Sequence, residues 1–315
     1  MATDEAEELA LRRLQYRLSM LETLIDQRAG RHWDLANPAS PLAVDDESLG
    51  PYKLSHLVGH CLSLAFDGLQ ATHALMVGLQ GRGEGMDDRT VRIPMAAHYP
   101  MLRSATESSA LAVWLLSPDD SHERRTRVFR AHWDDLVQDK RLMLAITESE
   151  FDDEPAEVKY HSKLRQQHEK VMRTKKARLR EVASLAQVNL DDVYLGLPGF
   201  EAMVGDATSR AGLRRGYGTG QWRLVSGLSH PSSSRSIMAS NIEQLGDSND
   251  GSVRALFTAR TDIVNNAVES AFLMYREASE LVAIRGNNRQ FKFRLPDGFP
   301  LPPGYEHLAP QPHQD

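Results

Sequence analysis

The chain has 315 residues, of which 41% are hydrophobic and 25% charged, a composition typical of a globular protein with a substantial core. Its net charge of −6 argues against a surface coated with nucleic-acid-binding charge, although it does not exclude a local basic patch. The single cysteine, Cys61, rules out an intramolecular disulfide and is typical of a reducing compartment. The acidic N-terminus lacks the pattern of a signal peptide, and the most apolar stretch, 110–116, is too short to span a bilayer. We therefore expect a cytoplasmic protein with no membrane partner.

Apolar residues that recur at intervals of three and four predict helices along most of the chain. The first is expected over residues 3–28 and the second over residues 52–79, with a loop rich in Pro, Gly and Asp between them at 30–51. A glycine-rich run at 81–85 should end the second helix.

Three further helices are expected over residues 95–116, 119–149 and 155–187, with Pro118 and Pro155 suited to the first turns of the last two. The third of them is strongly basic. Between positions 159 and 180 its basic residues are Lys159, Lys163, Arg165, Lys170, Arg173, Lys175, Lys176, Arg178 and Arg180.

Residues 189–220 are expected to be irregular, with a mobile glycine-rich connector at 212–220. A short helix should follow at 221–230 and a long one at 251–284, and the only candidate strand is 290–294. These elements predict an all-α antiparallel helical bundle. We divide the chain into N-terminal helices and loops (1–94), a helical bundle (95–285) and an irregular, Pro-rich tail (286–315).

The segment 222–230 carries the clearest chemical signal. At helical spacing Arg223, Ser226 and His230 share one face. Histidine can give and take a proton near neutral pH, and arginine holds phosphate with a planar fork. Such a set would suit metal-independent cleavage of an RNA backbone, with positive charge stabilising the crowded phosphate. The alternative is structural, because serine and histidine near a helix C-terminus can satisfy its last carbonyls.

A second pattern is Arg103 and Glu107, four residues apart on the predicted 95–116 helix. Their neighbours are mostly Ser and Ala, which allow another helix to approach closely. The pair is either a core salt bridge or a device that orients the helix carrying His230.

Two spacings resemble a known group of proteins. Arg223 and His230 form R-x6-H, at the outer limit of the R-x4-6-H signature of HEPN domains, helical bundles found in bacterial toxin and phage-defence ribonucleases. Arg103-x3-Glu107 followed much later by Ser226-x3-His230 looks like an uncharacterised bacterial helical family grouped near HEPN proteins. The resemblance covers about residues 95–284. It implies a homodimer with two Arg/His pairs in a shared cleft, in which Arg223 binds phosphate and His230 is catalytic. Leu224 departs from the pattern, since catalytic members typically have a polar residue there.

Other basic residues could follow an RNA backbone through phosphate contacts. The candidates are Arg214, Arg215, Arg173, Lys175 and Lys176. Their alternative role is a solvated surface. His56 and His60 have the spacing of two metal ligands, but two ligands do not make a site, so we predict neither metal nor cofactor.

The leading hypothesis is a HEPN-like protein that acts as a metal-independent endoribonuclease of a phage-defence or toxin system, with RNA as substrate and a second copy as partner. The competing hypothesis is a non-catalytic helical module that binds a protein or nucleic acid partner.

Overall fold

The computed structural model describes residues 2–29, 34–78, 91–147, 155–246, 254–296 and 299. Within them lie eleven α-helices, one two-stranded sheet and a short 3-10 helix, so the predicted all-α class is confirmed. The α-helices are α1 (Ala2–Arg28), α2 (Pro41–Glu47), α3 (Leu54–Val77), α4 (His98–Leu116), α5 (Ser121–Thr147), α6 (Pro155–Leu185), α7 (Leu190–Val193), α8 (Phe200–Arg210), α9 (Arg215–Leu228), α10 (Ser233–Met238) and α11 (Thr261–Arg285).

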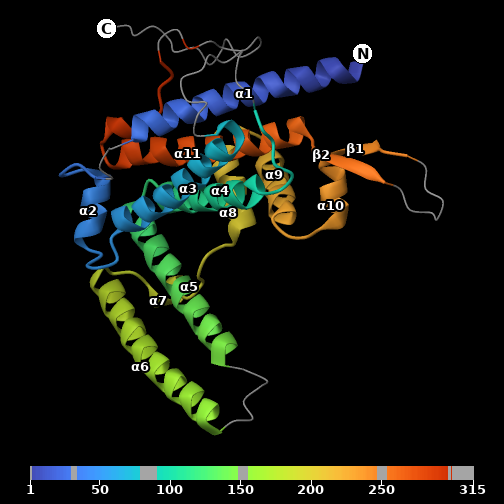
Figure 1. Cartoon of the computed structure of the whole chain (residues 1–315). Helices are drawn as coiled ribbons and strands as arrows, with labels where there is room; N and C mark the ends of the chain where they lie inside the picture. Colours follow the sequence, from blue (N-terminus) through green and yellow to red (C-terminus); the bar gives the residue numbers. More distant parts are fainter. Residues whose placement is uncertain are drawn as a thin grey trace, which may run out of the picture.

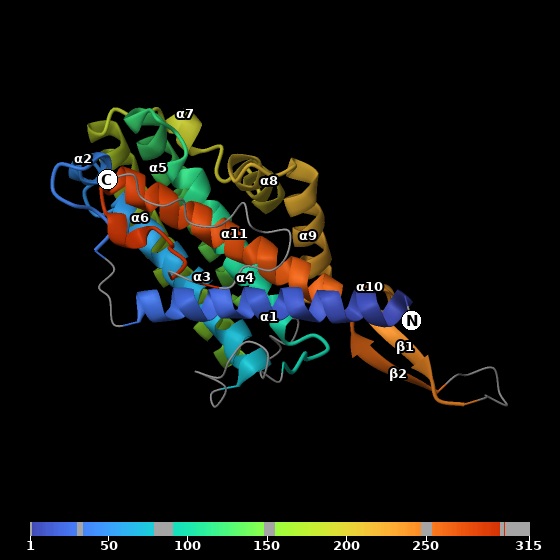
Figure 2. The same cartoon turned by 90° about the horizontal axis from the view of Figure 1, so that it is seen from above.

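Helix α4 lies at the centre of the bundle and packs against α3, α11, α8 and α9. Most of its side chains are buried. It meets α3 at Gly68, where a Cβ atom would lie only 2.7 Å from the Met101 carbonyl oxygen, so glycine is what permits this close crossing. Helix α1 lies along α11 on the other side of the bundle (Figures 1 and 2). The N-terminal helices α1 and α3 thus share one hydrophobic core with α4 and α11.

Helices α5 and α6 form an antiparallel pair that projects from the bundle, here called the arm (Figure 1). A buried ion pair joins its base to α2. Arg124 Nε lies 2.6 Å from Asp45 Oδ2, and the two side chains are 3% and 0% exposed. Arg124 also donates to the Pro118 and Asp119 carbonyls, so the buried charges are well hydrogen-bonded.

The prediction that residues 189–220 are irregular was wrong. They contain α7, α8 and the first turns of α9, which begins at Arg215 rather than near residue 221. Three of the four glycines of the 212–220 run therefore lie within α9, and one of them, Gly218, permits close packing of two helices. A Cβ atom at Gly218 would lie 1.8 Å from Thr208 Oγ1, so only glycine lets α9 approach α8 this closely.

The predictions for the strands and for the loop at 30–51 also need correction. Strand β1 (Ser240–Gln244) pairs antiparallel with β2 (Ala255–Ala259), and α11 begins only after β2. The predicted strand at 290–294 does not form, and its first two residues belong to the 3-10 helix η1 (Arg289–Phe291). Helix α2 lies in the expected loop because Ser40 caps its N-terminus, accepting from the Ala43 amide at 3.2 Å. The predictions for 81–85 and for the tail from residue 300 fall outside the described residues.

Candidate functional site

A carboxylate on α4 links that helix to α9. Glu107 Oε1 accepts from Arg103 Nε at 2.8 Å and from Trp222 Nε1 at 2.9 Å. The Arg103 and Glu107 side chains are 30% and 16% exposed, respectively, so the ion pair is shielded but not removed from solvent. Trp222 needs a partner for its indole N–H when it packs into a core, and Glu107 is that partner.

The same arginine reaches His230, which is 127 residues away in the chain. Arg103 Nη1 lies 3.1 Å from His230 Nε2. A guanidinium group carries only donors, so Nε2 accepts and the imidazole in this contact is neutral, with its hydrogen on Nδ1. The result is a chain of contacts in which Glu107 holds Arg103, and Arg103 faces an exposed imidazole nitrogen.

A pocket of about 570 Å³ adjoins this chain of contacts, a size suited to a small ligand or a nucleotide. It lies between α3, α4, α5 and α8, and its lining combines apolar side chains with hydroxyls and carboxylates. The lining residues are Leu57, His60, Cys61, Leu64, Pro100, Arg103, Ser104, Glu107, Ser108, Leu111, Asp135, Phe200 and Ser229. Burial raises the pKa of Cys61 to about 12, so its thiol is no nucleophile at neutral pH.

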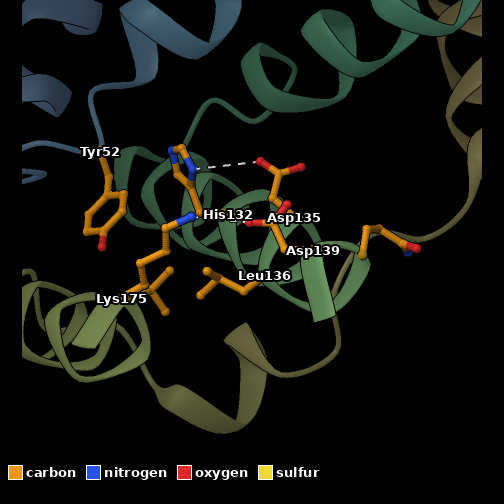
Figure 3. Close-up of a pocket in the computed structure, with 8 residues that line it drawn as sticks. Tyr52, His132, Asp135, Leu136, Asp139 and Lys175 are labelled. Carbon is orange, nitrogen blue, oxygen red and sulfur yellow. Dashed lines mark hydrogen bonds and ion pairs between the residues drawn. The ribbon is translucent and has the colours of Figure 1, made fainter. Parts of the chain in front are cut away.

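A second pocket, of about 460 Å³, lies at the base of the arm (Figure 3). The His132 ring lies 4.9 Å from the Tyr52 ring, and its Nδ1 lies 3.9 Å from Asp135 Oδ2. Burial lowers the pKa of His132 to about 4, so desolvation outweighs the attraction of a carboxylate at this distance. Burial and the neighbouring carboxylates Asp134 and Asp139 raise the pKa of Asp135. Asp135 lines both pockets, which are therefore neighbours.

The structure does not bring Arg223 and Ser226 into these contacts. Arg223 Nη2 donates to both oxygens of Glu201 on α8, at 2.7 and 2.9 Å. Ser226 is half-buried on α9. Helix α9 ends at Leu228, with Ser229 as its C-cap. His230 therefore lies beyond the helix and does not share a helical face with Arg223.

The basic residues proposed to bind RNA lie in two places. Arg214 and Arg215 stand at the start of α9, where Arg215 pairs with Asp206. The other three are on the arm. There Lys175 Nζ lies 3.2 Å from Asp139 Oδ2, Lys176 Nζ lies 5.1 Å from the Trp133 ring centroid, and Arg173 is exposed. Several of these charges thus already have acidic or aromatic partners.

Some residues of the site were missed in the sequence. Trp222 is not among the predicted site residues, although a tryptophan beside a polar cluster signals a hydrogen-bond donor. Asp135 and Phe200 carry no local signal, because they reach the pocket from α5 and α8 only through tertiary packing.

The protein is therefore an all-α bundle in which Glu107 binds Arg103 and the guanidinium group of Arg103 contacts His230. Compared with family models, with curated proteins and with solved structures, the chain matches none of them. Among the described helices, none is long and apolar enough to cross a membrane. In the same ranges no group of three or more His, Cys, Asp and Glu is placed to hold a metal ion.

Proposed function

We propose that this chain is a HEPN-like protein that cleaves RNA without a metal, with Arg103 and His230 as the acting pair. The observation that carries the proposal is the 3.1 Å contact between Arg103 Nη1 and His230 Nε2 beside a nucleotide-sized pocket. Glu107 orients the guanidinium by binding Nε, which leaves the Nη groups directed at a ligand. In this proposal Arg103 takes the phosphate-binding role that the resemblance assigns to Arg223.

The chemistry follows from the donors and acceptors in the contact. A phosphate that binds Arg103 replaces the imidazole as its partner and frees the Nε2 lone pair of His230. That nitrogen then takes the proton of a ribose 2′-hydroxyl. The 2′-oxygen bonds to phosphorus while the bond from phosphorus to the 5′-oxygen breaks, and the departing oxygen takes a proton from water. Arg103 stabilises the added charge on the phosphate.

The remaining predicted residues act as support. Arg223 can exchange the exposed Glu201 for a second phosphate, and Ser226 lies two residues before the end of α9. Arg214 and Arg215, with Arg173, Lys175 and Lys176 on the arm, attract the RNA backbone over a longer range. A phage-defence or toxin system is the setting that the resemblance to HEPN proteins suggests.

A second candidate function is a non-catalytic module that binds a protein or nucleic acid. One observation favours it. Glu107, Arg103, Trp222 and His230 already satisfy one another within the chain, as a purely structural network would.

Cleavage of labelled single-stranded RNA in the presence of a chelator separates the two functions. His230→Ala should reduce the rate by about 100-fold or more, and Arg103→Lys should reduce it because lysine lacks the planar fork. The matched control is His56→Ala, which removes an exposed histidine of α3 and should leave the rate unchanged. A wild-type protein that does not cut RNA, or a His230→Ala variant that cuts as fast as the wild type, would leave the non-catalytic module as the function.

A further inference from the structure

The outer half of the arm carries an apolar strip that nothing in the described chain covers. Leu142 and Ile146 of α5 are 61% and 51% exposed, and Tyr160 and Val171 of α6 are 64% and 50% exposed. The outer half lies clear of the bundle (Figure 1). Exposed apolar side chains that gather on one surface mark an interaction site, whereas single ones do not.

The spacing of these residues places them on one side of the arm. On α5, Asp135, Asp139, Leu142 and Ile146 follow one another at intervals of four, three and four. On α6, Tyr160, Leu164, Val171 and Lys175 follow at four, seven and four, so each set shares a helix face. The ion pair between Asp139 and Lys175 joins the two sets on the same side. We call this side the arm face.

The order of residues along α6 on the arm face is self-complementary. Glu157, three residues before Tyr160, lies on the same face near the tip, and Lys175 lies near the base, with Tyr160, Leu164 and Val171 and the polar Gln167 between them. If two α6 helices run antiparallel, Tyr160 meets the partner's Val171 and Glu157 meets the partner's Lys175. Lys175 keeps Asp139 as a partner, because an ammonium group has three donors. A parallel pairing would instead bring like charges together.

The size and charge of the arm face also fit a second copy. From Glu157 to Lys175 an α-helix rises about 27 Å, and two helices side by side are about 20 Å across. Two such faces bury about 1,000 Å² in total, the lower limit for a specific interface. The carboxylates Glu157, Asp135 and Asp139 on this face would repel an anionic lipid surface. The basic residues of α6 lie outside this face. Lys159, Lys163 and Lys170 each precede one of its apolar residues by one position, so they lie about 100° around the helix from the arm face.

We infer that the arm face docks a second copy of this chain, with the two arms antiparallel in a four-helix arrangement. This inference is independent of RNA cleavage. The base of the arm face adjoins the candidate site through Asp135, which lines both pockets, so the tip of the partner's arm comes to lie beside that site.

Analytical ultracentrifugation of the full chain over a range of concentrations tests the inference. The wild type should form a dimer, and Tyr160→Glu should weaken dimerisation by about tenfold or more. The matched control is Val158→Glu, another apolar position on the same helix, 46% exposed but about 160° around the helix from Tyr160, which should not affect dimerisation. Glu157→Lys and Lys175→Glu should each weaken the dimer, and the double variant should restore it. A wild type that stays monomeric, or a Tyr160→Glu variant that dimerises normally, overturns the inference.

Disulfide trapping tests the antiparallel direction with small changes that the fold should tolerate. A mixture of Tyr160→Cys and Val171→Cys proteins should form crosslinked dimers under mild oxidation. Tyr160→Cys alone should not, because the two copies of residue 160 would lie about 16 Å apart, beyond disulfide reach. The native Cys61 is buried and should not contribute. The antiparallel arrangement would be overturned if Tyr160→Cys alone crosslinked efficiently and the mixture with Val171→Cys gave no additional crosslinked dimer.

Discussion

Replacing Glu107 with glutamine tests whether the network around Arg103 is a tightly held unit. Glutamine keeps the shape of the side chain and an acceptor oxygen, but it removes the negative charge that binds Arg103 Nε at 2.8 Å and Trp222 Nε1 at 2.9 Å. The perturbation therefore weakens two hydrogen bonds without creating a cavity. It also loosens the guanidinium that faces His230.

The expected loss of stability follows from these two bonds. Hydrogen bonds to charged groups contribute about 1.5–3 kcal/mol and neutral ones about 0.5–1.5 kcal/mol, so each bond loses about 1 kcal/mol. Because the Glu107 side chain is only 16% exposed, solvent screening reduces this modestly. We expect Glu107→Gln to lower the free energy of unfolding by about 2 kcal/mol, which for a chain of 315 residues is a fall in melting temperature of about 3 °C.

Urea unfolding and thermal melts monitored by circular dichroism measure this loss. The matched control is Glu201→Gln, which weakens the pair with Arg223, where both partners are largely exposed. It should cost less than about 0.5 kcal/mol. A double-mutant cycle with Trp222→Phe, which removes the indole N–H together with part of the ring, should give a coupling energy of about 1 kcal/mol, because the loss of ring volume is common to both backgrounds and cancels. Equal losses for the two glutamine variants, or no coupling to Trp222, would refute the reasoning.

Two further predictions concern buried polar groups outside the site. Asp45→Ala leaves the buried Arg124 charge unpaired and should lower the free energy of unfolding in urea by about 3–5 kcal/mol. The control Glu8→Ala breaks an exposed pair with Arg12 and should lower it by less than about 1 kcal/mol. Similar losses for the two variants would show that the Asp45 pair is not buried in solution. His98 is fully buried, and burial lowers its pKa from 6.5 to about 4. Below pH 6.5 the unfolded chain binds a proton that the folded chain does not, so stability should be full above this pH and fall as the pH drops toward 4. His98→Leu should flatten this fall in melts across that pH range, and an unchanged slope would contradict the assignment to His98.

The long helices follow from local patterns in the sequence. The predicted helices 3–28, 52–79 and 95–116 match α1, α3 and α4 to within about three residues, because a recurrent apolar spacing over several turns has no other regular solution. Short elements escaped this reasoning. Helix α8 and the two strands are too brief for a periodic pattern, and packing against α4 and α11 or local pairing determines them.

In the candidate site, too, some contacts follow from local sequence and others depend on tertiary packing. The pairing of Arg103 with Glu107 follows from local sequence, because residues four apart on a helix are neighbours. Which residues this pair contacts depends on how the helices pack. Helix spacing predicted Arg223 beside His230, but α9 ends two residues before His230, and the packing of α8 gives Arg223 to Glu201. The contact between Arg103 and His230 spans 127 residues, and such a contact depends on how α9 docks on α4, which local spacing does not encode.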